Sequence, residues 1–126
     1  MSDRILIVED DQDVARLMAA RLASVGYEVR AVVDGALAIK EAQGFRPNLV
    51  VLDLMLPAGG GQSVLQRLKL SSHTNTIPVI VVTGVESEES KRQLMKQGVA
   101  AYLRKPYEPQ ALIAKVKELV RPQTLD

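Results

Sequence analysis

Three short runs of consecutive apolar residues constrain the fold of this chain more than any other feature. They span residues 5–8, 49–52 and 79–82, and each consists only of Val, Ile and Leu. A strand with one face in water alternates apolar and polar residues, whereas a strand covered on both faces is apolar throughout. The runs therefore predict a parallel sheet with helices on both sides. Residues 27–33 and 99–103 are two weaker strand candidates.

Amphipathic helical patterns separate these runs. The first has an apolar stripe and stops at Gly26; its stripe consists of Val14, Leu17, Met18, Leu22 and Val25. The others are expected at 36–43, 62–70 and 86–97 and from about Pro109, with stops at Gly44, Gly98 and Pro122. The helix at 86–97 has only Leu94 and Met95 as strong apolar residues, so we expect it to be loosely held. Five strands alternating with five helices predict an α/β fold.

Size and composition set limits on the class of protein. A chain of 126 residues is expected to be one domain, at 1–121, with 122–126 as a tail or the start of a linker. The net charge of +1 gives no chain-wide attraction to nucleic acid or to a membrane surface. There is no cysteine and no apolar run long enough to span a bilayer. We expect a soluble cytoplasmic domain.

Polar residues follow the proposed strands at the points where the strands end. Glu9, Asp10 and Asp11 follow the first run, Asp53 the second and Thr83 the third, while Lys105 follows the strand candidate at 99–103. In a doubly wound sheet, ligands bind beyond the carboxyl ends of the strands. We therefore expect these side chains to meet at one edge of the sheet.

A cluster of carboxylates at that edge needs a cation. Glu9, Asp10 and Asp53 repel one another, and Asp53 also lies in an otherwise apolar run. The available donors are oxygens without His or Cys, which favours Mg²⁺ over zinc. A phosphoryl group at such a site would meet a metal, the ammonium of Lys105 and the hydroxyl of Thr83, with a carboxylate placed as nucleophile.

With these motifs in this order, the chain resembles the receiver domain of two-component response regulators over about residues 4–121. The resemblance implies a flavodoxin-like, doubly wound parallel sheet of five strands in the order 2-1-3-4-5, with five helices. It makes Asp53 the phosphoacceptor, with Mg²⁺ held by Asp10, Asp53 and the backbone carbonyl of Met55, and with Glu9 in the outer shell or acting through water. Thr83 and Lys105 would contact the phosphoryl group, Thr83 and Tyr102 would form the switch, and the Lys105–Pro106 bond is often cis in this family.

The resemblance also implies how the domain works. A histidine kinase or phosphotransfer protein would phosphorylate Asp53, and a surface formed by the fourth helix, fifth strand and fifth helix would change its affinity for a downstream protein. The candidates for this surface, which is also a possible homodimer contact, are Lys91, Arg92, Lys96, Arg104 and Tyr107. Such a domain is not an enzyme beyond its own phosphorylation and dephosphorylation.

Several alternatives stay open. The chain is either a stand-alone regulator or the receiver part of a longer regulator, often one that binds DNA, whose output domain is absent; no element of this chain reads DNA by itself. An aspartyl-phosphate hydrolase requires a second acid, typically two residues after the nucleophile, to protonate the leaving group. This chain has Met55 at that position, which argues against turnover of external substrates. A flavodoxin-like cofactor binder would want a phosphate loop and more than 3% aromatic residues.

Other polar positions have simpler interpretations. Asp11 is expected to cap the first helix and Asp13 to be a solvated acid in its first turn. The glycines at 59–61 predict a flexible turn, with Gly60 where many family members carry an acid, and His73 is expected to be solvated. Met55 and Val85 lie two positions beyond Asp53 and Thr83. The resemblance implies that side chains at these positions control the access of water to the phosphoryl group, and because neither can orient an attacking water, we expect slow self-dephosphorylation.

Overall fold

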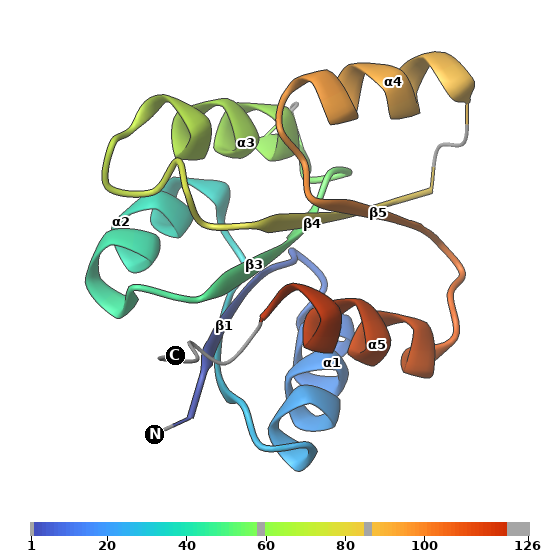
Figure 1. Ribbon diagram of the computed structural model, residues 1–126. Helices are drawn as coiled ribbons and strands as arrows, with labels where there is room; N and C mark the ends of the chain where they lie inside the picture. The colour runs from blue at the N-terminus through green and yellow to red at the C-terminus, as the bar shows by residue number, and fades with distance from the viewer. Residues whose placement is uncertain (1, 58–59, 85–86, 121–126) are drawn as a thin grey trace, which may run out of the picture.

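The computed structural model describes residues 2–57, 60–84 and 87–120. Strands and helices alternate along the whole of this range (Figure 1). The elements are β1 (Arg4–Val8), α1 (Gln12–Ser24), β2 (Glu28–Val32), α2 (Gly35–Phe45), β3 (Leu49–Asp53), α3 (Gly60–Leu70), β4 (Val79–Thr83), α4 (Glu88–Lys96), β5 (Ala101–Arg104) and α5 (Pro109–Leu119).

The five strands form one parallel sheet in the order β2-β1-β3-β4-β5. This confirms the expected doubly wound fold and its strand order. The helices α1 and α5 cover one face, and α2, α3 and α4 cover the other (Figure 1). The winding direction reverses between β1 and β3, which are neighbours in the sheet, so the crevice that binds ligands in such folds opens at their carboxyl ends.

Two apolar clusters, one on each face, explain the continuous apolar runs. Leu6 and Val8 of β1 point into the cluster beneath α2 and α3, whereas Ile5 and Ile7 point into the cluster beneath α1 and α5. All four side chains are fully buried, and β3 and β4 are buried along their whole length. The sheet is therefore clamped from both sides, which holds the ends of β1, β3 and β4 in place.

The sequence predicted that the second helix stops at Gly44, but α2 continues past this residue. It continues through Phe45 and ends at Arg46, which takes up a left-handed conformation with φ of 53°. Phe45 is buried in the core, and the guanidinium carbons of Arg4 and Arg30 lie 5.6 and 4.6 Å from its ring centroid. Packing of Phe45 extends the helix past a residue that often ends one.

The apolar stripe assigned to the first helix is only partly correct. Met18 and Leu22 are buried, but Val14, Leu17 and Val25 are 37, 56 and 40% exposed. The helix packs on the sheet through a narrower arc than the stripe implied. The excess apolar residues therefore lie on the surface of α1.

The glycines at the start of α3 are not a flexible turn where the structure describes them. Gly60 and Gly61 form the first turn of the helix, and a Cβ at Gly61 would lie 2.6 Å from the carbonyl carbon of Leu54. Gly61 is therefore required by the close approach of α3 to the segment after β3. Residues 58 and 59 lie outside the described range, as does Val85.

The helix α4 has one buried residue, Leu94, among its nine. Its first turn is capped by the Ser87 hydroxyl, which accepts a hydrogen bond of 3.0 Å from the Ser90 amide. The fifth strand begins at Ala101, two residues later than expected, because the Val99 amide donates instead to the Leu94 carbonyl at the end of α4, at 3.2 Å. The small apolar contact of α4 agrees with a loosely held helix, although its mobility stays a prediction.

Candidate functional site

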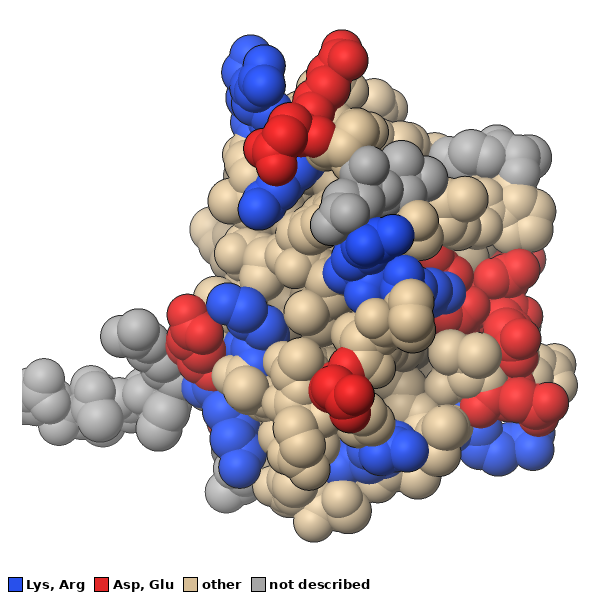
Figure 2. All heavy atoms as spheres, turned by 90° about the vertical axis from the view of Figure 1, so that its right-hand side faces the viewer, with Lys and Arg blue, Asp and Glu red and all other residues tan. Residues whose placement is uncertain are grey.

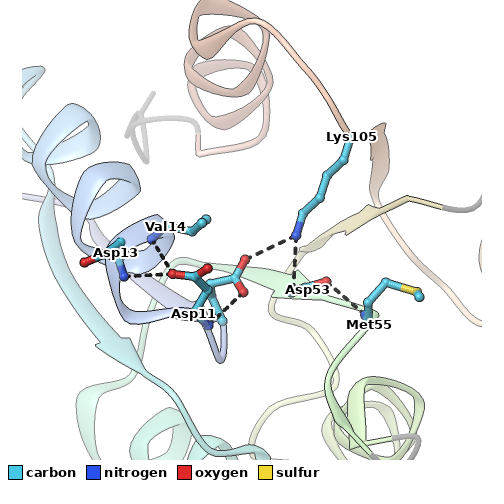
Figure 3. Close-up of polar contacts among 7 residues, drawn as sticks. Asp11, Asp13, Val14, Asp53, Met55 and Lys105 are labelled. Atoms are coloured by element: carbon cyan, nitrogen blue, oxygen red, sulfur yellow. Dashed lines mark hydrogen bonds and ion pairs between the residues drawn. The ribbon is translucent and has the colours of Figure 1, made fainter.

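The polar residues that end β1, β3 and β5 meet at the carboxyl edge of the sheet. Glu9 directly follows β1, Asp53 is the last residue of β3, and Lys105 directly follows β5. Because β1 and β3 are paired in parallel, Glu9 and Asp53 reach the same edge. Lys105 then extends across from β5, so that its ammonium lies between the two acids (Figure 3).

The ammonium of Lys105 contacts both buried carboxylates. Its Nζ lies 3.2 Å from Asp53 Oδ2 and 3.4 Å from Glu9 Oε1. The side chains of Asp53 and Glu9 are 5 and 2% exposed, and that of Lys105 is 34% exposed. The Lys105–Pro106 peptide bond is cis, as the resemblance implied.

Backbone amides hold both carboxylates in fixed orientations. The Met55 amide donates to Asp53 Oδ1 at 2.9 Å, and the Asp11 amide donates to Glu9 Oε2 at 3.2 Å. Asp11 itself caps α1, since its Oδ1 accepts from the amides of Asp13 and Val14 (Figure 3). Asp11 is therefore the helix cap that was expected, and Asp13 is the exposed acid in the first turn.

A third carboxylate completes an acidic cluster. Glu9, Asp10 and Asp53 each place one carboxylate oxygen within 4.8 Å of the other two. Asp10 is exposed whereas Glu9 and Asp53 are buried, so the cluster has one open side toward solvent. The surface at this edge of the sheet has a concentration of acidic side chains beside a basic group (Figure 2).

The electrostatics of the cluster reflect this crowding. Burial, together with the neighbouring Asp53, raises the pKa of Glu9 to about 7, although the Asp11 amide and Lys105 act in the opposite direction. Burial alone would lower the pKa of Lys105, but attraction to Asp53 and Glu9 outweighs burial and raises it. One ammonium therefore faces more negative charge than it can balance.

The cluster fits a hard divalent cation. All three converging groups offer oxygen donors, and neither His nor Cys takes part, which is the donor set that Mg²⁺ prefers. A divalent ion would also relieve the repulsion that raises the pKa of Glu9. These residues could therefore hold the metal that the sequence predicted.

Thr83 lies on β4, the strand next to that of Asp53, and Tyr102 lies on β5, the next strand along. Thr83 ends β4, is 1% exposed, and accepts a hydrogen bond of 2.8 Å at its carbonyl from the Lys105 amide. Tyr102 of β5 pairs with Val81, two residues before Thr83, and its half-buried ring packs against the α2–α3 side of the core. The ring is thus partly inward on the same side of the sheet as α4.

The structure separates the proposed contact residues into two groups. Lys91, Arg92 and Lys96 are exposed on α4, and Arg104 is exposed at the end of β5. Tyr107 is half-buried and packs against the core cluster beneath α1 and α5. Tyr107 therefore packs on the α1–α5 side of the sheet, whereas α4 lies on the other side.

One neighbouring feature had no sequence signal. A hollow of about 580 Å³ begins at Asp10 and runs between the β2–α2 connection and α3. Asp34, Ser63 and Arg67 contribute to its lining. Their proximity to Asp10 depends on how α2 packs on α3, which no local pattern encodes.

The side chain of His73, which the sequence predicted to be solvated, is exposed.

Comparison with known proteins agrees with this geometry. The family model for the response regulator receiver domain matches residues 5–117, so the chain belongs to that family. It is a receiver domain of the two-component type, with a flavodoxin-like fold.

Individual relatives are similar over nearly the whole chain. The DNA-binding dual master transcriptional regulator RpaA of Synechocystis is 37% identical over 94% of this chain and 49% of its own length. The phosphate regulon regulator PhoB of Escherichia coli is 32% identical over 96% of this chain and 53% of its length. The response regulator PleD of Caulobacter vibrioides is 35% identical over 96% of this chain and 27% of its length. The chain thus spans about a quarter to a half of these relatives.

Solved structures show the same fold. A CheY-like receiver domain protein from Methanospirillum hungatei superposes with a TM-score of 0.86 at 29% identity, covering 95% of this chain and 94% of that one. A response regulator from Chloroflexus aurantiacus gives a TM-score of 0.86 at 31% identity, covering 95 and 98%. Within the described residues, no helix is both long and apolar enough to cross a membrane.

Proposed function

We propose that Asp53 is the phosphoacceptor of this receiver domain. The observation that carries this assignment is the position of its carboxylate, which is buried at the end of β3 with Oδ1 held by the Met55 amide and Oδ2 beside Lys105. A fixed carboxylate with a nearby cation is prepared for in-line attack on phosphorus.

The reaction transfers a phosphoryl group without an external oxidant or reductant. A carboxylate oxygen of Asp53 forms the new bond to phosphorus while the bond from phosphorus to the donor atom breaks. From a phosphohistidine that is protonated on its second ring nitrogen the leaving group is neutral imidazole, and from acetyl phosphate it is acetate. Lys105 balances charge on the phosphoryl oxygens, and the Thr83 hydroxyl donates a hydrogen bond to one of them. Asp10, Asp53 and the Met55 carbonyl would hold Mg²⁺, with Glu9 in the outer shell or acting through water, and the ion would supply charge neutralisation on the phosphoryl oxygens.

Phosphorylation would be read on the surface of α4, β5 and α5. Thr83 is buried one strand away from Asp53, so a new bond to the phosphoryl group would draw it toward the site and leave space for Tyr102 to turn inward. The helix α4 is held by a single buried side chain and is the element that can follow this change. Lys91, Arg92, Lys96 and Arg104 are then the contacts offered to a downstream protein or to a second copy of the domain.

The experiment is incubation with beryllofluoride or acetyl phosphate plus Mg²⁺, followed by NMR and intact mass. We expect an adduct on the wild-type protein and on Asp13→Asn, which removes an exposed acid of the same type nearby. Asp53→Asn should give none. An adduct that persists in Asp53→Asn would overturn the assignment, and the absence of any adduct on the wild type would indicate a receiver fold without phosphoryl chemistry.

The relatives are longer than this chain, which favours a receiver domain that belongs to a larger regulator. Because the chain covers about half of RpaA and of PhoB, we propose that residues 1–121 form a receiver domain and that 122–126 begin a linker to an output domain. A stand-alone regulator that acts by protein contact is the alternative. The reading frame that follows Asp126 distinguishes the two.

The phosphorylated state should persist. The side chain of Met55 is 54% exposed near the site and has no group that orients water, while Val85 lies outside the described residues. We expect dephosphorylation of the isolated domain to be slowed in the wild type relative to Met55→Asn, measured by NMR after removal of the donor. Equal rates would contradict this role of Met55.

A further inference from the structure

The helices α3 and α4 lie on the same face of the sheet (Figure 1). A groove of about 340 Å³ is lined by residues from the C-terminal half of α3 and by the residue that follows α4. These residues are Leu65, Gln66, Lys69 and Leu70 of α3, and Gln97. This groove is separate from the acidic cluster, since α3 and α4 end at the opposite edge of the sheet. We propose that it is a docking site for a protein segment that presents an apolar side chain next to a carboxylate.

An exposed leucine supplies the apolar contact. Leu70 is 84% exposed, the largest exposure among the large apolar side chains that the structure describes. Leu65 is fully buried and forms the floor of the same groove. An apolar side chain that entered between them would remove the surface of Leu70 from water, and burial of apolar surface favours binding.

A lysine without a carboxylate partner supplies the charge. The side chain of Lys69 crosses from α3 toward the turn at Gly98, where its Cε would lie 3.6 Å from a Cβ at that glycine. Its one hydrogen bond is a long contact of 3.5 Å to the Asn75 carbonyl, and within the described ranges no carboxylate pairs with it. Burial lowers the pKa of Lys69, which reflects an ammonium that has lost water without gaining an anion.

The charge on both helices favours an acidic partner over a basic one. Lys69 is the charged residue in the lining of the groove, the helix α3 contains no acid, and the two acids of α4 lie in its first turn, away from the groove. The partial negative charge at the helix C-termini opposes an anion in these last turns, but it is about half an elementary charge per helix and is spread over the last carbonyls, whereas the ammonium of Lys69 carries a full charge. A carboxylate placed directly on Lys69 Nζ therefore gains more than it loses.

An unpaired amide oxygen supplies a place for a donor. Gln97 Oε1 is buried and has no hydrogen-bond partner among the described residues. Such an orphaned acceptor is unfavourable. A backbone N–H of a docked segment, met by a rotation of the Gln97 side chain, would satisfy it.

The test is a titration of the ¹⁵N-labelled protein, without phosphodonor, followed by amide chemical shifts. The probe is an acetylated and amidated peptide of sequence Leu-Glu-Glu-Leu-Leu-Glu, and the control probe has Lys in place of each Glu. We expect shifts centred on Lys69, Leu70, Gln97 and Gly98 with the acidic peptide only. No saturable shifts, shifts centred elsewhere, or equal binding of the Lys peptide would overturn the proposal.

Matched variants make the test specific to the groove. Lys69→Gln and Leu70→Ser should each weaken the acidic peptide about five-fold or more, while leaving the adduct at Asp53 unaffected. Lys40→Gln and Leu37→Ser remove an exposed lysine and a half-exposed leucine from α2 and should leave peptide affinity unchanged. Equal effects of both pairs would show non-specific attraction. Because no phosphodonor is present, failure here is distinguishable from failure of Asp53 as phosphoacceptor.

Discussion

Among the site residues, Glu9 has the least favourable electrostatic environment. Its carboxylate is buried next to Asp53, and one partly exposed lysine serves both acids. The arrangement costs stability in the absence of a cation, and the same cost favours binding of one. Function at the residue scale thus depends on charges that the folded chain alone does not balance.

Replacing Glu9 should stabilise the metal-free protein. The pKa of Glu9 is raised from 4.5 to about 7, so the folded state favours the protonated form. Its contribution to stability is fully present below pH 4.5 and is lost as the pH rises through about 7. In EDTA, Glu9→Gln should therefore exceed the wild type in unfolding free energy by on the order of 2 kcal/mol at pH 8, with little difference near pH 4.5. Urea unfolding followed by circular dichroism measures this, and a difference independent of pH would contradict it.

Replacing Asp10 should weaken the metal site specifically. Asp10→Asn removes one of the three converging carboxylates but keeps its shape, so we expect Mg²⁺ affinity to fall about ten-fold or more. The Mg²⁺ dependence of amide shifts in an NMR titration gives the affinity. Asp13→Asn is the matched control and should bind Mg²⁺ like the wild type. If both variants bound equally well, Asp10 would not be a ligand.

At the scale of elements, Gly61 and Gly44 both lie within helices but have opposite effects on stability. Gly61 lies where α3 touches the backbone of Leu54, the residue immediately after Asp53 at the end of β3. Gly44 lies inside α2, and a Cβ there would meet nothing within 4 Å. The first glycine is needed for packing near the site, and the second only weakens a helix.

Alanine substitutions should therefore change stability in opposite directions. Gly61→Ala should lower the unfolding free energy by about 1–3 kcal/mol, because the backbone of Leu54 must move. Gly44→Ala should raise it by about 0.5–1 kcal/mol, because it reduces the backbone entropy lost on folding. Denaturant unfolding of the pair compares them directly. A stabilising Gly61→Ala would show that α3 is not held against Leu54.

At the scale of the whole molecule, rigidity and looseness are divided between the sheet and one helix. The central strands are buried on both faces and hold Glu9 and Asp53 in place. The helix α4 packs through Leu94 alone and lies over the strands that end in Thr83 and Arg104. A change at the rigid edge can therefore be transmitted to a loose element without unfolding the core.

Hydrogen exchange should reveal this division. In the unmodified domain, amides of α4 should exchange about ten-fold or more faster than those of β1 and β3, because a local opening of α4 exposes little apolar surface. Mass spectrometry of peptic peptides resolves the two regions, with α5, which buries Leu112, Ile113 and Val116, as a helical control. Equal protection of α4 and α5 would mean that contacts beyond Leu94 hold α4.

The sequence by itself determined the three central strands β1, β3 and β4, their burial on both faces and the residues that end or follow them. These follow from local patterns, because continuous runs of Val, Ile and Leu occur where both faces of a strand are covered. Charged residues at the carboxyl ends of such strands are typical of a ligand site, since few structural roles require them there. The capping role of Asp11 was also local, since its side chain reaches amides only two and three residues away.

Only the tertiary structure decided how the distant pieces meet. The extension of α2 through Gly44 depends on the burial of Phe45, and the requirement for Gly61 depends on the position of Leu54. The place of Tyr107 near α1 and the groove around Lys69 depend on which helices share a face. Lys105 lies 96 residues from Glu9 and 52 residues from Asp53 along the chain. It becomes their partner because β1, β3 and β5 end at the same edge of the sheet. Such contacts are set by packing across the sheet, which a pattern along the chain does not record.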